Sequence, residues 1–184
     1  MKILLTGANG YIGKRLLGML VALGHEVVCC VRDKNRFPTE GIYANSKVSV
    51  FEIDFLETGQ NISSLREMDA AYYLIHSMSD DTASFEALEA RSARNFVSLV
   101  QQTKIKQIIY LGGITNEKVL SKHLASRKMV EDILRTSGIP ITSLKAGIIV
   151  GSGMALLNLE IWCRVVLDRR SSSDVAEELA EAVA

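Results

Sequence analysis

Short apolar runs alternate along this chain with longer segments in which apolar residues recur every three or four positions. Short apolar runs that end at glycine or polar residues are typical of buried strands, and the longer spacing is typical of helices that pack by one face. Strands are predicted at 2–6, 26–31, 48–53, 70–75, 107–111 and 141–146. Helices are predicted at 12–23, 82–103, 121–136 and 154–168, with a short one near 61–67.

The order of these elements predicts the fold class. Strands that alternate with helices pair in parallel through right-handed crossovers. The runs EVVCCV and QIIYL lack polar alternation, which indicates a sheet that is covered on both faces. We therefore expect an α/β fold, a doubly wound parallel sheet with helices on both sides, in three layers.

Composition narrows the setting of this fold. The chain has 184 residues, of which 48% are hydrophobic, and this size suits one domain. Its 21 basic and 21 acidic residues balance, so no overall field attracts nucleic acid. No apolar run is long enough to span a membrane, and glycines interrupt the apolar N-terminus too early for a signal peptide. We expect a cytoplasmic protein with no nucleic-acid partner and no membrane span.

The three cysteines, Cys29, Cys30 and Cys163, bear on the redox setting. The first two are neighbours in a predicted strand, where adjacent side chains point to opposite faces and do not bridge easily. We interpret all three as small buried hydrophobes in a reduced cytosolic protein, and we predict no metal site.

A glycine-rich turn follows the first predicted strand and leads into the first predicted helix. Gly7 permits a tight turn, Gly10 lets the backbone approach a pyrophosphate, and Gly13 lets the helix pack closely on the sheet. The start of the helix offers N–H groups and the positive end of a dipole to the phosphates. We expect a dinucleotide to be bound by Thr6, Gly7, Asn9, Gly10, Tyr11, Ile12 and Gly13.

The end of the second predicted strand distinguishes NADP from NAD. An NAD site places a carboxylate there for the ribose 2′-hydroxyl, whereas here Val31 fills that position and Arg32 follows. A guanidinium binds the 2′-phosphate of NADP, so we assign Arg32 to that phosphate and favour NADP(H) over NAD(H). Two alternatives stay open. A shift of one residue makes Asp33 a ribose ligand, and Arg36 is either a second phosphate contact or a solvated loop charge.

Residues after the third and fourth predicted strands complete the expected cofactor site. Asp54, with Phe55 beside it, either meets the adenine edge or makes a local turn. Ile75 and His76 stand at the carboxyl edge of the sheet, where the cofactor lies in such folds. His76 either contacts ribose or substrate, or has a structural role.

Several segments stand together in a recognisable order: LLTGANGYIG, VRD, AYYLIHSM, IIYLGGI, HLASRKMVEDIL and AGIIVGSG. Over about residues 2–160 they resemble the atypical short-chain dehydrogenases/reductases, close to the NmrA-like and extended NAD(P)-binding epimerase groups. The resemblance implies a Rossmann fold and an NAD(P) site. We expect this domain to cover 1–170, with a short C-terminal helix at 171–184 and the rest of the family's substrate-binding region short or missing.

The catalytic positions depart from those that the resemblance implies. The family uses a Tyr-x-x-x-Lys pair on the helix after the fifth strand, and His123 and Arg127 stand at the matching positions. The family serine falls at Gly112 or Gly113. His123 is able to move a proton and Arg127 to hold the ribose, so both are our candidates for catalysis. The alternative is that both are ordinary exposed residues of an amphipathic helix.

Three functions follow from these observations. The first is an NADP-dependent oxidoreductase that acts on a small carbonyl, enone or quinone-like substrate. The second is a non-catalytic module that senses NADP(H), and the third is an accessory subunit that the cofactor only stabilises. The apolar helix predicted at 154–168 lines a pocket, packs on the sheet or forms a homodimer surface. We favour the oxidoreductase, by analogy with the commoner use of the fold.

Overall fold

Within the part of the chain that the structure describes, six parallel strands form one sheet in the order β3-β2-β1-β4-β5-β6. The computed structural model of the chain describes residues 1–76, 82–113 and 122–146. The strands are β1 (Lys2–Thr6), β2 (Glu26–Val31), β3 (Val48–Glu52), β4 (Ala70–Tyr73), β5 (Gln107–Gly113) and β6 (Ile141–Ala146). The chain runs outward from β1 to β3 and then returns to β4 on the other side of β1. The carboxyl ends of β1 and β4 therefore mark the point where the strand order reverses.

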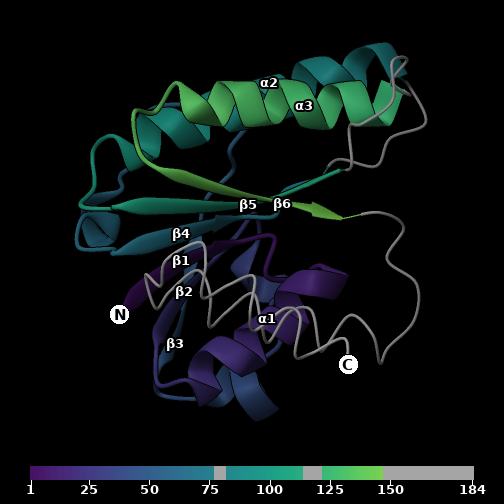
Figure 1. The fold of residues 1–184 in the computed structure, drawn as a ribbon. Helices are drawn as coiled ribbons and strands as arrows, with labels where there is room; N and C mark the ends of the chain where they lie inside the picture. The colour runs from purple at the N-terminus through teal and green to yellow at the C-terminus, as the bar shows by residue number, and fades with distance from the viewer. Residues whose placement is uncertain (77–81, 114–121, 147–184) are drawn as a thin grey trace, which may run out of the picture.

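Helices cover both faces of this sheet, which confirms the predicted three-layer α/β fold. Figure 1 shows α1 (Tyr11–Ala22) on one face and α2 (Thr82–Val100) beside α3 (Lys122–Arg135) on the other. Two buried clusters correspond to the two faces. Because side chains alternate along a strand, Tyr72 of β4 lies in the cluster under α1 and Tyr73 in the cluster under α2.

Several predicted elements differ from the structure, and most of the differences are one to three residues at an end. The helix predicted at 61–67 is wrong, since that segment holds only a 3₁₀ turn, Ser63–Leu65. The fourth strand ends at Tyr73, and the next amide, the Leu74 N–H, donates to the side-chain hydroxyl of Thr6 in β1 (3.0 Å) instead of to a backbone carbonyl. The fifth strand continues through Gly112 and Gly113, which pair with β6. The helices predicted at 154–168 and 171–184, and the domain boundary at 170, lie outside the described residues.

The two cysteines of β2 are free and buried, on opposite faces of the sheet. Burial raises the pKa of Cys29 to about 12, and burial with the neighbouring Cys29 raises the pKa of Cys30 still further. Both thiols therefore stay protonated and act as small core side chains. Cys163 lies outside the described residues.

No helix among the described residues is long and apolar enough to cross a membrane.

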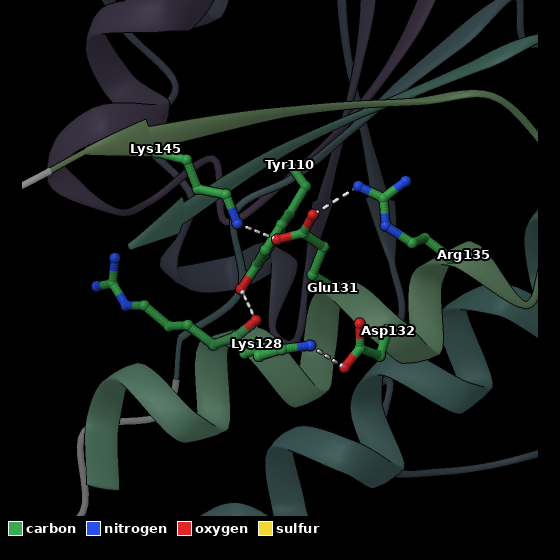
Figure 2. Close-up of polar contacts among 7 residues, drawn as sticks. Tyr110, Lys128, Glu131, Asp132, Arg135 and Lys145 are labelled. Carbon is green, nitrogen blue, oxygen red and sulfur yellow. Dashed lines mark hydrogen bonds and ion pairs between the residues drawn. The ribbon is translucent and has the colours of Figure 1, made fainter. Parts of the chain in front are cut away.

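A carboxylate fixes α3 to the last strand. Glu131 is largely buried and accepts hydrogen bonds from Lys145 of β6 and from Arg135 one turn along its own helix (2.6 Å), as Figure 2 shows. Burial alone would raise the pKa of Glu131, but the hydrogen bonds from the two cations outweigh it and hold the pKa below its ordinary value. The ionised form of Glu131 therefore stabilises the fold.

The Glu131 contacts predict a pH-dependent loss of stability. A group whose pKa is lowered on folding stabilises the fold above its unfolded pKa, and this contribution disappears as the pH falls through the folded value. Glu131→Gln should lower the free energy of unfolding near neutral pH by about 1–2 kcal/mol, since both cations are partly exposed. The difference from the natural chain should become smaller as the pH falls from 7 to about 3, because the carboxyl group is increasingly protonated there.

Urea denaturation at the two pH values measures this effect. Glu86→Gln, at an exposed position of α2, is the matched control and should change stability by less than about 0.5 kcal/mol at either pH. An equal loss for Glu131→Gln at both pH values would contradict the role of its charge.

Candidate cofactor site

The turn after β1 brings three backbone segments into contact. Gly7 has a φ of +66°, and a β-carbon there would lie 2.7 Å from the carbonyl oxygen of Leu74. A β-carbon on Gly13 would lie 2.2 Å from the carbonyl oxygen of Gly7. The Gly10 N–H donates to that same oxygen at 2.9 Å, which closes the turn. Only glycine fits at positions 7 and 13, as the dinucleotide motif predicts.

The helix that starts at this turn is open to an anion. Gly10 is its N-cap and provides no side-chain hydrogen bond, and the first turn of α1 carries no acidic residue. Arg15 adds a positive charge nearby, because its guanidinium lies 3.6 Å above the ring of Tyr11. An uncapped helix start next to a glycine turn suits the pyrophosphate of a dinucleotide.

The other predicted residues of the turn contribute in different ways. Asn9 and Tyr11 are exposed, and Ile12 is half-buried. Thr6 is fully buried, and its hydroxyl donates to the Tyr72 carbonyl at 3.0 Å and accepts from Leu74. This side chain therefore joins β1 to β4 beneath the turn, so a cofactor contact from Thr6 would come from its backbone.

The end of β2 presents Arg32 to solvent. Arg32 is exposed, while the carboxylate of Asp33 accepts from the Asn35 N–H (2.9 Å) and caps a 3₁₀ turn, Lys34–Arg36. The Lys34 N–H in turn donates to Glu52 of β3. Asp33 thus has a local structural role, and Arg32 and Arg36 are both exposed cations at this edge of the sheet.

The segment after β3 makes a local turn. Asp54 accepts from the Leu56 N–H at 2.9 Å, and the side chain of Gln60 bonds both backbone groups of Asp54. The Phe55 ring lies in the core, 5.8 Å from the Phe96 ring. Contacts of Asp54 and Phe55 with adenine stay predictions, and the geometry of Asp54 agrees with the local-turn alternative.

The segment after β4 brings three polar side chains together. His76 Nδ1 lies 3.3 Å from Oε1 of Glu89 in α2, and the Ser126 hydroxyl of α3 donates to the other oxygen of that carboxylate. Glu89 is 2% exposed and Ser126 is 1% exposed. Ile75, just before His76, packs against the cluster under α2.

The sequence reasoning above missed Glu89 and Ser126. The signal for Glu89 was present, because a glutamate four residues after Phe85 and seven before Phe96 interrupts the apolar face of α2. A charge on a buried face requires a partner. That the partners are His76 and Ser126 follows only from the way β4, α2 and α3 pack.

The α3 positions that match the family's catalytic pair lie near the end of β5. The Arg127 side chain passes over Gly113, where an added β-carbon would lie 3.3 Å from Arg127 Cδ. The Tyr110 hydroxyl donates to the Arg127 carbonyl at 3.0 Å. Lys128 points elsewhere and pairs with Asp132 at 2.8 Å (Figure 2). The His123 side chain lies outside the described residues.

Sequence comparison agrees with this geometry. A family model described as NAD(P)H-binding matches residues 7–153, which include the glycine turn and all later strands. The chain therefore belongs to this NAD(P)H-binding family, a result that confirms the resemblance found in the sequence. No curated protein is significantly similar to the chain.

Solved structures of nicotinamide-dependent proteins share the fold. A Bacillus halodurans protein described as an NAD-dependent epimerase/dehydratase has a TM-score of 0.72 and 18% identity over 91% of this chain and 88% of its own. Citrobacter sp. triphenylmethane reductase, complexed with NADP(H), has a TM-score of 0.72 and 18% identity over 90% and 65%. Bacillus cereus UDP-glucuronic acid 4-epimerase, in complex with NAD, has a TM-score of 0.67 and 22% identity over 82% and 57%. The chain thus spans less than two thirds of the reductase and the epimerase.

Two glycines of α1 provide a matched test of the site. Gly13→Ala places a β-carbon 2.2 Å from backbone, so we expect it to displace the turn and to weaken NADPH binding at least about tenfold. Gly18→Ala meets nothing within 4 Å and should stabilise α1 by up to about 1 kcal/mol, with cofactor affinity retained. Fluorescence titration and thermal unfolding measure the two effects. Equal cofactor affinity in both variants would show that the close approach at Gly13 is not needed for binding.

Proposed function

We propose that this chain is an NADP(H)-dependent oxidoreductase of the atypical short-chain dehydrogenase type that reduces a small carbonyl, enone or quinone-like compound. The observation that carries the proposal is the glycine turn and open helix start beside the β1–β4 switch point. In this fold a dinucleotide crosses the carboxyl edge of the sheet there, with its pyrophosphate at the helix start. The buried free thiols of β2 suit a cytoplasmic setting.

The charges at the end of β2 support NADP over NAD. Arg32 is exposed, while Asp33 uses its carboxylate to cap a turn. A guanidinium at this place suits a phosphate and offers nothing specific to a ribose hydroxyl. The fold is shared with one structure that contains NADP(H) and another that contains NAD, so the support comes from this chain's own residues.

The chemistry divides between the cofactor and the chain. Bound NADPH would supply a hydride, and the chain would bind it and orient an acceptor at the ends of β4, β5 and β6. Arg127, whose side chain crosses the end of β5, is our candidate for holding the ribose. His123 stands where the family's tyrosine stands and remains a candidate for moving a proton.

A second function has its own support. A module that senses NADP(H) needs the glycine turn but no proton donor, and both positions of the family's Tyr-x-x-x-Lys pair are replaced here. Such a module binds the cofactor and does not consume it.

Cofactor choice is tested by removing one charge. Arg32→Ala should weaken NADPH binding about 10- to 100-fold, the worth of one charge-assisted phosphate contact, and leave NADH binding unchanged. Arg66→Ala, which removes an exposed cation away from the glycine turn, should leave both affinities unchanged. Separate fluorescence titrations with NADPH and NADH give the constants. Equal or tighter binding of NADH by the natural chain would reject the NADP assignment and implicate Asp33.

Turnover distinguishes the two functions. Malachite green, a triarylmethyl cation, accepts a hydride at carbon and needs no proton, whereas benzil, a diketone, needs both. We expect the natural chain to oxidise NADPH with both acceptors, as measured by the loss of nicotinamide absorbance, with Gly13→Ala giving the background rate. Tight NADPH binding without oxidation by either acceptor would favour the sensing module.

A further inference from the structure

His76, Glu89 and Ser126 form a continuous polar chain at the edge of the candidate site. The His76 imidazole follows β4 and is 27% exposed, whereas the Glu89 side chain beneath it is 3% exposed. Its two carboxylate oxygens contact His76 (3.3 Å) and the Ser126 hydroxyl, so both are engaged. A carboxylate is buried in this way only when partners compensate for its loss of water.

The contact with Glu89 determines which nitrogen of the neutral His76 imidazole carries the hydrogen. When Glu89 is ionised its carboxylate only accepts hydrogen bonds, so Nδ1 of His76 then carries the hydrogen that the two groups share. Neutral imidazole in water prefers to carry its hydrogen on Nε2. The buried carboxylate therefore selects the less common tautomer and orients the ring, as the carboxylate does in serine-protease triads.

His76 follows the strand at whose end a bound nicotinamide would react. Leu74, two residues earlier, lies against Gly7 of the glycine turn. In doubly wound folds with this strand order, a bound dinucleotide would extend from the turn in two directions, its adenine half toward β2 and β3 and its nicotinamide half toward β4 and the strands beyond it. His76 leaves the sheet on the nicotinamide side, and its partial exposure lets it exchange protons with solvent.

Other groups on this side are less suited to donate a proton. Burial raises the pKa of Tyr73 and of Tyr110, and the Tyr110 hydroxyl already donates to a backbone carbonyl. Lys145 is bound to Glu131. Arg127 is too basic to release a proton.

We propose that His76 is the proton donor of the reduction and that Glu89 is its positioning residue. The inference rests on the proposed oxidoreductase function. Bound NADPH would supply a hydride that forms the C–H bond at the carbonyl carbon, while the C=O π electrons would move to oxygen. Protonated His76 gives the Nε2 proton to that oxygen, so an alcohol, NADP⁺ and neutral imidazole result. Solvent then returns one proton to Nε2.

The ratio of benzil reduction to malachite green reduction isolates the proton step, because only benzil needs a proton. His76→Gln should lower this ratio about 100-fold or more, the usual worth of a general acid. His25→Gln is the matched control, because His25 directly precedes β2 at the amino end of the strands, and it should leave the ratio unchanged. His123→Gln tests the rival donor. An unchanged ratio in His76→Gln, or a loss of that size in His123→Gln instead, would overturn the assignment.

Nitrogen NMR of histidine-labelled protein gives a readout that is independent of activity. The three histidine variants assign the signals, and neutral His76 in the natural chain should carry its hydrogen on Nδ1. Glu89→Met, which removes the acceptor at similar volume, should shift His76 to the Nε2–H form. If that variant does not fold, the tautomer of His76 in the natural chain by itself tests the role of Glu89. An Nε2–H tautomer in the natural chain rejects the role of Glu89. Failure of the natural chain to oxidise NADPH with either acceptor is a different result, which rejects the proposed function itself and the donor role with it.

Discussion

The contact between Gly7, Gly13 and Leu74 is the constraint on which the rest of the structure depends. A β-carbon at position 13 would lie 2.2 Å from the carbonyl of Gly7, and one at position 7 would lie 2.7 Å from that of Leu74. These neighbours are backbone atoms of the residues that directly follow β1 and β4, so they cannot move aside without disturbing the strand ends. The close approach sets α1 against β1, brings Leu74 beside the turn and leaves the helix start open.

The switch point divides the sheet into two halves with different polar features. On the β2–β3 half the described charged groups include exposed cations such as Arg32 and turn-forming carboxylates such as Asp33 and Asp54. On the β4–β6 half two glutamates are largely buried, and each ties helix to helix or helix to strand. A dinucleotide has a matching asymmetry, since its adenylate end is recognised by charge and its nicotinamide end is held in a fixed geometry for reaction.

Two buried carboxylates of the described residues differ in their partners. Glu131 binds two cations and serves the packing of α3. Glu89 binds a hydroxyl and an imidazole, of which only the imidazole reaches the protein surface. A buried carboxylate that binds one nitrogen of an exposed imidazole leaves the second ring nitrogen available to another partner. A carboxylate held between two cations provides no such nitrogen. This edge of the sheet therefore still has an ionisable side chain, His76, although His123 and Arg127 stand in place of the family's tyrosine and lysine.

The sequence by itself determined the α/β class, all six strands, the major helices of the described region and the glycine turn, because each depends on local periodicity or on residues adjacent in the chain. It also indicated Arg32, His76 and Arg127 as candidate site residues. Only the tertiary structure decided what surrounds them. The first amide after β4, the Leu74 N–H, bonds to a threonine 68 positions away in the chain. The link from His76 through Glu89 to Ser126 spans three elements, at separations of 13 and 37 residues. Such contacts are set by the packing of helices on a sheet, and no local pattern encodes which buried charge meets which partner.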